Sequence, residues 1–210
     1  MNTRNVKTPQ SRMQKRAKRT RKRLKKAALD VFSEKAIDAV TVEEITEKAD
    51  LGKGTLYQHF NDKEDIVVTL VDEAVDHLIE QLRSYDGSVE KLEDMLEHLL
   101  LAHYRFSVDC REEFLLLFQG KLLVRLQSET LDELNEPYLR YLKEIEELVS
   151  PYLSPKIDPL KVRRLACACA GFAFGFFSFV MTEMNKNEIE SNIKPLRRAF
   201  VMSLGTFLGR

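Results

Sequence analysis

Twenty-five residues, Thr41 to Asp65, constrain the fold of this chain most, with the sequence TVEEITEKADLGKGTLYQHFNDKED. Thr41 and Glu44 form a capping-box pattern, in which each side chain satisfies a backbone N–H at the start of a helix. Asp50 ends this helix, because aspartate favours turns and tolerates the left-handed backbone that a sharp bend requires. The segment therefore predicts a short helix followed at once by a tight turn.

A second helix is predicted from Lys53 to Phe60, with Gly52 as its N-cap. At about 100° per residue, Leu56 and Phe60 point to one side of this helix. The opposite face carries Gly54, Thr55 and Gln58, and the flanks carry Tyr57 and His59. A helix with such a face can enter the major groove of DNA, because the glycine allows close backbone approach and the polar side chains can reach base edges.

A third helix is predicted to follow, with Asn61 and Glu64 repeating the capping pattern. Its first turn offers backbone N–H groups and the ammonium of Lys63 to a DNA phosphate. The alternative is an ordinary cluster of three helices whose polar residues are only solvated.

The run ADLGKGTLYQHFNDKED resembles the DNA-binding signature of the tetracycline-repressor (TetR, or AcrR-like) family of bacterial transcriptional regulators. The resemblance covers Arg21 to Val71. It implies DNA contacts from Thr41, Lys53, Thr55, Tyr57, His59 and Lys63, with Gly54 and Gln58 on the base-reading face. Two positions depart from the family pattern: Asp50 stands where a turn glycine is usual, and Gly52 stands where a serine commonly caps the recognition helix.

The charge of the chain is strongly divided, although its formal total is zero. Residues 1–29 contain twelve Lys or Arg and no Asp or Glu, so residues 30–210 carry 21 basic against 33 acidic side chains. The first 20 residues are too polar to bury a core, and we expect a disordered basic arm that neutralises phosphates or enters a minor groove. A solubilising tail is the alternative.

The fold class predicted for the whole chain is all-α, because hydrophobic residues recur at spacings of three and four throughout. The predicted domains are a basic arm over residues 1–20, a three-helix DNA-binding domain with a helix-turn-helix over 21–65, and a larger helical ligand-binding and dimerisation domain over 66–210. A long amphipathic helix, Asp62 to Ser84, is predicted to connect them. Further helices are predicted over Val89–Val108, Glu112–Gln127, Leu131–Tyr152, Pro159–Asn185 and Glu188–Leu208.

The last two predicted helices are unusually apolar. Residues Leu165 to Met181 run without a charge, but a membrane span needs about 20 such residues. We therefore expect no membrane insertion and predict instead a four-helix interface between two copies of the chain. The resemblance implies the same homodimer.

A pocket for a small-molecule inducer is implied by the resemblance. Aromatic and polar residues that could line it are His103, Tyr104, Phe106, Phe114, Phe118, Tyr138, Phe172, Phe176 and Met181. Such a cavity would take a hydrophobic or amphipathic ligand. The alternative is that these residues are simply core.

No metal, cofactor or catalytic site is predicted. Cys110, Cys167 and Cys169 do not suggest a disulfide framework, so a reducing, intracellular environment is expected. The histidines lack paired ligand spacing, although Glu73 and His77 share a helix face. Zinc sensing and a redox switch through Cys110 are the alternatives. No nucleophile motif, phosphate loop or metal signature indicates an enzyme.

The sequence thus predicts a cytoplasmic, nucleoid-associated, dimeric transcriptional regulator, acting as a repressor that leaves a pseudo-palindromic operator when an inducer binds. Two rivals are a DNA-organising or regulatory protein that ignores small molecules and an enzyme with a helical substrate domain.

Overall fold

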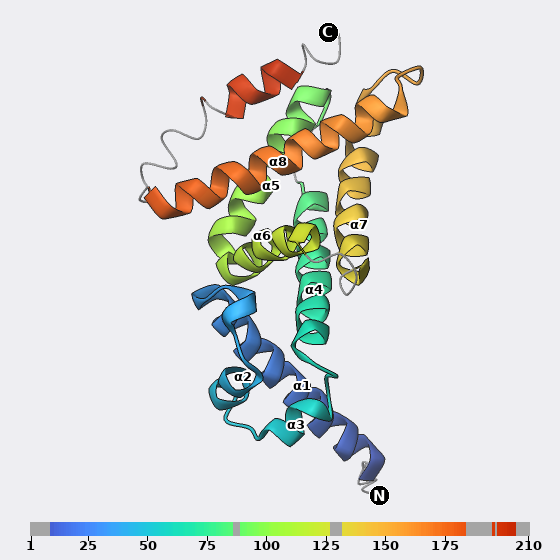
Figure 1. Cartoon of the computed structure of the whole chain (residues 1–210). Helices are drawn as coiled ribbons and strands as arrows, with labels where there is room; N and C mark the ends of the chain where they lie inside the picture. Colours follow the sequence, from blue (N-terminus) through green and yellow to red (C-terminus); the bar gives the residue numbers. More distant parts are fainter. Residues whose placement is uncertain (1–8, 86–88, 127–131, 184–194, 196, 205–210) are drawn as a thin grey trace, which may run out of the picture. The chain divides into compact units, whose positions relative to one another are not determined.

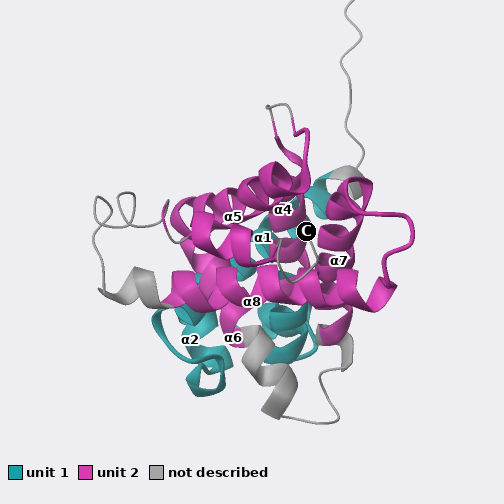
Figure 2. Ribbon diagram, turned by 90° about the horizontal axis from the view of Figure 1, so that it is seen from above, with its two compact units in different colours: residues 1–70 teal, residues 71–210 magenta. Residues whose placement is uncertain are grey.

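The computed structural model describes residues 9–85, 89–126, 132–183, 195 and 197–204. Over these ranges it contains α-helices and short 3-10 helices and no strand, which confirms the all-α class (Figure 1). The chain divides into two compact units, residues 1–70 and 71–210, coloured separately in Figure 2. The boundary falls inside the long connecting helix α4, Lys63–Arg83.

The N-terminal unit has helices α1 (Pro9–Glu34), α2 (Val42–Lys48) and α3 (Lys53–Tyr57), a 3-10 helix η1 (Ile37–Ala39), and the first turns of α4. Each of its α-helices has at least one apolar side chain fully buried in the core, and these side chains include Leu24, Ile45, Leu56 and Ile66. This unit supports α3, whose five residues make only one turn and a half.

The expected disordered arm is wrong for residues 9–20, because α1 begins at Pro9. The segment from there to Glu34 contains no further proline and no glycine, and it is rich in Arg, Lys, Gln and Ala, which are good helix formers. Burial of Leu24 and Ala28 anchors the second half of α1. The helix then extends toward the N-terminus, because each further residue whose backbone is fixed adds one hydrogen bond. Residues 12–19 are exposed, so their charges lie on a helix surface.

Two local predictions around α3 are also corrected. The helix ends at Tyr57 and not at Phe60, because the next turn tightens: the N–H of His59 donates to the Leu56 carbonyl at 2.8 Å. The cap of α4 is shifted by one residue from the prediction. Asp62 accepts from the Asp65 N–H at 2.7 Å, and the Asp65 carboxylate accepts from the Asn61 N–H at 2.9 Å.

The C-terminal unit contains the rest of α4 and four further long helices, α5 (Leu92–Asp109), α6 (Arg111–Leu126), α7 (Asp132–Val149) and α8 (Pro159–Glu183). A 3-10 helix η2, Ser150–Tyr152, joins α7 to the loop before α8. Residues 197–204 are helical and belong to the predicted last helix, most of which lies outside the described residues. Among the helices described, none is long and apolar enough to cross a membrane.

Two arginine side chains link α4 to α7 within the C-terminal unit. Arg140 lies 2.9 Å from carboxylate oxygens of both Asp72 and Asp76. Arg83 makes a two-pronged contact with Glu144, with distances of 2.7 and 2.5 Å. Bidentate arginine–carboxylate pairs fix geometry as well as adding energy, so they set the register of α4 against α7.

A buried histidine is the main polar feature of the C-terminal core. His103 of α5 is 2% exposed, and its Nδ1–H donates to the Leu99 carbonyl at 2.6 Å. Its Nε2 then accepts from the Tyr141 hydroxyl of α7 at 2.5 Å. Burial lowers the pKa of His103 to about 4, so the imidazole is neutral at pH 7.

We expect His103→Gln to reduce the acid sensitivity of the fold. Below pH 6.5 the unfolded imidazole takes up a proton that the folded one refuses until about pH 4, so the free energy of unfolding falls across that range. This one group should account for a loss of about 2 kcal/mol between pH 7 and pH 5. Urea unfolding of both proteins at the two pH values measures the difference. An equal loss in the variant would show that His103 is not buried in neutral form.

Candidate nucleic-acid interface and ligand-binding residues

The capping box predicted at the start of α2 is confirmed. The Thr41 hydroxyl accepts from the Glu44 N–H at 3.3 Å, and the Glu44 carboxylate accepts from the Thr41 N–H at 2.9 Å. The Glu44 carboxylate also pairs with Lys35, and these contacts lower its pKa. Thr41 is exposed, so its side chain is accessible to a partner while it holds the helix start.

The turn after α2 contains Asp50 in the left-handed conformation, with φ of 49°. A residue with a side chain is strained in this conformation, and glycine is therefore usual at such positions. Arg23 of α1 donates to the Asp50 carboxylate at 2.8 Å and to its carbonyl at 3.2 Å. Arg23 therefore supports the turn. Its contact with the Asp50 carboxylate is one that a glycine at this position could not make, because glycine has no side chain.

Helix α3 buries one side and exposes the other, as predicted. Leu56 and Phe60 are almost fully buried, whereas Tyr57 is 57% exposed. The remaining predicted positions are exposed at Lys53, Gly54 and Gln58 and half-buried at Thr55 and His59. A methyl group added at Gly54 would meet nothing within 4 Å. The protein itself thus gives no packing reason for a glycine at this position.

The two lysines predicted to contact phosphates have different surroundings. Lys53 is exposed and pairs only with the exposed Glu43 among the contacts described, so its ammonium is available to a competing anion. Lys63 is half-buried, and its ammonium donates to the carbonyls of Ile37 and Val40 at 3.0 and 3.1 Å. Lys63 therefore holds the segment between α1 and α2 in place. A DNA contact from either lysine stays a prediction.

Arg21 is a further residue of this site that the sequence reasoning missed. Its guanidinium donates to the His59 carbonyl at 2.5 Å and lies 4.0 Å from the centre of the Phe60 ring. A second nitrogen donates to the Thr69 hydroxyl at 3.3 Å. Arg21 thus fixes the chain that leaves α3. The only signal in the sequence was its place at the polar end of the buried stripe of α1.

The predicted ligand residues fall into separate groups. His103 and Phe114 share a cluster with two residues that were not predicted, Tyr141 and Phe174; the Phe174 ring lies 5.6 Å from Phe114 and 6.4 Å from His103. Phe172 stacks on Phe176 at 5.2 Å and on Phe200 at 4.1 Å, in a second cluster.

Other predicted ligand residues have structural partners of their own. The Tyr138 hydroxyl donates to the Leu117 carbonyl at 2.6 Å, and burial raises its pKa. Phe106 is buried against the ring of His77. Tyr104 lies 5.8 Å from Phe177, whose ring is 5.5 Å from Phe176, so Tyr104 joins the second cluster. Phe118 is half-buried, and the side chain of Met181 lies outside the described residues.

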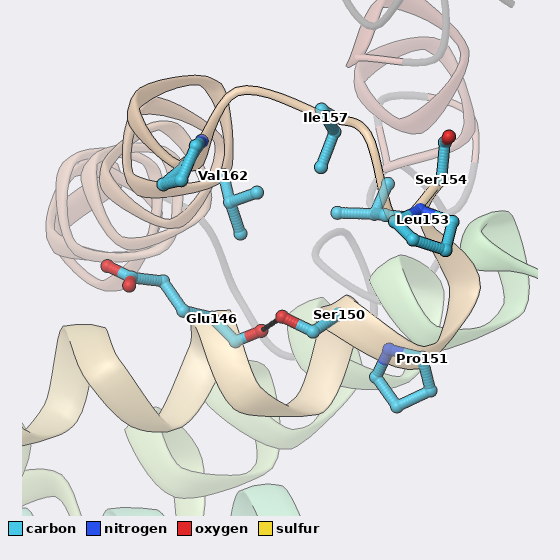
Figure 3. A pocket seen from close by; sticks show the side chains of 9 residues that line it. Glu146, Ser150, Pro151, Leu153, Ser154, Ile157 and Val162 are labelled. Atoms are coloured by element: carbon cyan, nitrogen blue, oxygen red, sulfur yellow. Dashed lines mark hydrogen bonds between the residues drawn. The ribbon is translucent and has the colours of Figure 1, made fainter.

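An open pocket of about 510 Å³ lies between the end of α7, η2 and the start of α8 (Figure 3). Its wall includes Pro151, Leu153 and Val162, and the Ser150 hydroxyl donates to the Glu146 carbonyl at 2.6 Å beside it. None of the nine predicted ligand residues lines it. This pocket is therefore distinct from the predicted cavity.

Comparison with known proteins connects this geometry to one family. Residues 24–70 match the family model described as bacterial regulatory proteins, tetR family. An HTH-type transcriptional regulator of Staphylococcus aureus (strain USA300) is 29% identical over 101 residues, which are 46% of this chain and 52% of that protein. A regulator with the same statistics occurs in strain NCTC 8325. The chain thus matches about half the length of these curated relatives.

Solved structures show the same fold over nearly the whole chain. A TetR-family transcriptional regulator from Rhodococcus sp. aligns with a TM-score of 0.68 and 16% identity, covering 90% of this chain and 98% of that one. The regulator FadR from Bacillus subtilis, in complex with stearoyl-CoA, gives 0.65 and 18%, covering 87% and 96%. A fatty acid metabolism regulator from Clostridium perfringens gives 0.65 and 22%, covering 85% and 96%.

Lys63→Met should destabilise the protein, whereas Lys53→Met should not. The first substitution leaves two carbonyls without a charged donor, at a cost of about 1–3 kcal/mol. The second removes only an exposed ion pair, and such pairs contribute little. Urea unfolding of the two variants and the parent gives the comparison. Equal stability of the two variants would refute a structural role for Lys63.

Proposed function

We propose that this chain, whose residues 24–70 belong to the TetR family of bacterial regulatory proteins, is a dimeric transcriptional regulator that releases operator DNA when a small amphipathic molecule binds. It would act in the cytoplasm on nucleoid DNA as a repressor. The proposal assigns binding and not catalysis to the chain.

One observation carries the DNA-binding part: α3 buries Leu56 and exposes Gly54 and Tyr57, and Gln58 directly after the helix is exposed as well. A short helix with a polar outer face fits the major groove, and a glycine in its first turn lets the backbone approach base edges. Thr55, which is half-buried, shares the base-reading face with Gly54 and Gln58, and Lys53, Tyr57 and His59 lie beside it, where phosphates would be. Thr41 and Lys63 complete the proposed contacts from α2 and α4.

The exposed first half of α1 supports the same proposal. Residues 12–19 contain Arg12, Lys15, Arg16, Lys18 and Arg19, and no acidic residue. A basic helix that projects from a DNA-binding unit attracts the phosphate backbone irrespective of base sequence. The C-terminal unit is acidic in balance, so we expect it to be kept away from DNA.

The dimer is proposed on the apolar surface of α8 and the last helix. Phe172 and Phe176 are only half-buried although they stack in one cluster with Phe200. Met202, on the last helix, is 66% exposed. A second copy that packed its own α8 and last helix here would bury this excess in a four-helix interface.

The ligand class is proposed from the C-terminal core. Phe114 and Phe174 provide apolar rings, and His103 with Tyr141 provides a neutral polar pair among them. A cavity opened between these side chains on binding would suit an acyl chain with a polar group at one end. The stearoyl-CoA in the solved Bacillus subtilis FadR supports this class. Because α4 belongs to both units, a ligand that shifts it in the C-terminal unit would reorient α3.

Gly54→Ala should separate DNA affinity from stability. The added methyl meets open space and raises helix propensity, so the free protein should be unchanged or up to about 1 kcal/mol more stable. In the groove the methyl would stand between backbone and bases, and operator affinity should fall at least about tenfold. The operator is first recovered by sequencing genomic DNA captured by the purified protein. Fluorescence anisotropy and thermal unfolding then measure the two quantities.

Two lysine variants provide a matched control for this experiment. Lys53→Ala and Lys143→Ala each remove one exposed lysine from an exposed ion pair, but only Lys53 lies on the proposed interface. Only Lys53→Ala should weaken binding and reduce the salt slope by about 1. Binding of no duplex by the parent protein at low salt would refute the proposed function, and full affinity of Gly54→Ala would refute the close approach.

Stearoyl-CoA is the probe for the inducer. At saturation it should lower operator affinity by roughly 5- to 150-fold, the usual range of coupling between two sites. Coenzyme A alone, which lacks the acyl chain, should have no effect. Anisotropy titrations of the operator with each compound give the comparison. Unchanged affinity with both stearoyl-CoA and free stearate would contradict an acyl ligand.

A further inference from the structure

Three potential metal ligands that are far apart in the sequence meet in the C-terminal unit. They are His77 of α4, Cys110 at the end of α5 and Glu113 in the first turn of α6 (helices labelled in Figure 1). One ligand atom from each lies within 4.8 Å of the other two. His77 Nδ1 is 2.7 Å from Glu113 Oε2. A nitrogen, a sulfur and an oxygen therefore surround a single point.

The spacing is close to that of a tetrahedral zinc site. Bonds of about 2.0–2.3 Å at tetrahedral angles place ligand atoms roughly 3.3–3.7 Å apart. The His77–Glu113 pair would have to open from 2.7 Å, and any wider pair would close from at most 4.8 Å. Each of these changes is at most about 1.5 Å, which is within the reach of a side-chain rotation.

The surroundings of Cys110 fix its position and favour a cation. Its N–H donates to the Phe106 carbonyl and its carbonyl accepts from the Phe114 N–H, both at 2.9 Å. The carboxylates of Glu113, Asp109 and Glu112 are near enough to its sulfur to act on its charge. The same carboxylates that disfavour a thiolate attract a divalent ion, whose charge reverses the local preference.

The three side chains remain accessible to an ion from solvent. The side chain of His77 is 37% exposed and that of Glu113 is 28% exposed. Cys110 is half-buried. A set of imidazole, thiolate and carboxylate ligands suits Zn²⁺, which binds nitrogen, sulfur and oxygen donors alike.

We propose that His77, Cys110 and Glu113 bind one Zn²⁺ ion, with water as the fourth ligand. The Cys110 thiol releases one proton to solvent as its sulfur bonds to the metal, and no atom is oxidised or reduced. The imidazole donates the lone pair of one ring nitrogen. Glu113 exchanges its contact with His77 for a bond to the ion.

The site would join α4 directly to the junction of α5 and α6. Its regulatory consequence rests on the proposed function: an ion that fixes α4 in the C-terminal unit should alter operator affinity, because α4 continues into the N-terminal unit. The metal site itself does not depend on DNA binding.

Titration with Co²⁺ in place of zinc tests the site. The purified full chain, freed of metal by chelation, should bind one Co²⁺ with a near-ultraviolet thiolate-to-cobalt band and the visible absorption of a four-coordinate ion. Cys110→Ser should lose the thiolate band. His77→Gln and Glu113→Gln should bind Zn²⁺ at least about tenfold more weakly in competition with a chromophoric chelator.

Cys167→Ser is the matched control, because it removes an exposed thiol of α8 outside the cluster. It should leave the band and the affinity unchanged. Absence of a saturable thiolate band in the parent protein would overturn the proposal without relying on any variant. So would a band that persists in Cys110→Ser or disappears in Cys167→Ser.

Operator titrations with and without Zn²⁺ test the consequence separately. Zinc should change the affinity of the parent at least about fivefold and leave that of Cys110→Ser unchanged. Cobalt binding with unchanged operator affinity would overturn the regulatory role alone. Failure to bind any duplex would overturn the proposed function and leave the cobalt result standing.

Discussion

The N-terminal unit depends on the burial of α3 against its neighbours. A helix of five residues is not stable in water by itself, because nucleation costs more than so few hydrogen bonds return. Leu56 and Phe60 supply the missing energy by burial in the core. Arg21 then fixes the exit of the helix through the His59 carbonyl and the Phe60 ring. The outward residues of α3 therefore do not contribute to the core and are accessible to a partner.

Helix α4 is held in the C-terminal unit by a buried apolar face, which includes Val71, Leu78 and Leu82, and polar contacts add to this packing. Arg140 and Arg83 connect it to α7 on one side, and His77 contacts Glu113 of α6 on another. Each contact joins partners at least 36 residues apart, so it forms only when the helices have assembled. Whatever changes one of these contacts acts on a helix that also begins in the N-terminal unit. Proposed regulation by an acyl ligand or by zinc uses this continuity.

Capping and turn signals between neighbouring residues predicted the candidate DNA interface well. The ends of the helices and the state of the basic arm were predicted less well. The capping box of Thr41 and the turn at Asp50 act within four residues, and both are present. The end of α3 and the cap of α4 were misplaced by a few residues, because the chain tightens after Leu56 and because Asp62, and not Asn61, caps the next helix. The disordered arm was predicted because the first 20 residues are too polar to bury a core, which overlooked that lysine and arginine favour helix when an anchored segment follows.

The sequence by itself determined the all-α class, the helix-turn-helix and the polar face of α3, since helix periodicity and capping are written in residues three or four apart. Only the tertiary structure decided which distant side chains meet. In the folded chain Lys63 donates to carbonyls between α1 and α2, the Tyr141 hydroxyl donates to His103, and Cys110 lies beside His77. Such contacts depend on how the helices pack against one another. The spacing of residues along the chain shows which face of a helix is buried, but not which distant helix covers it.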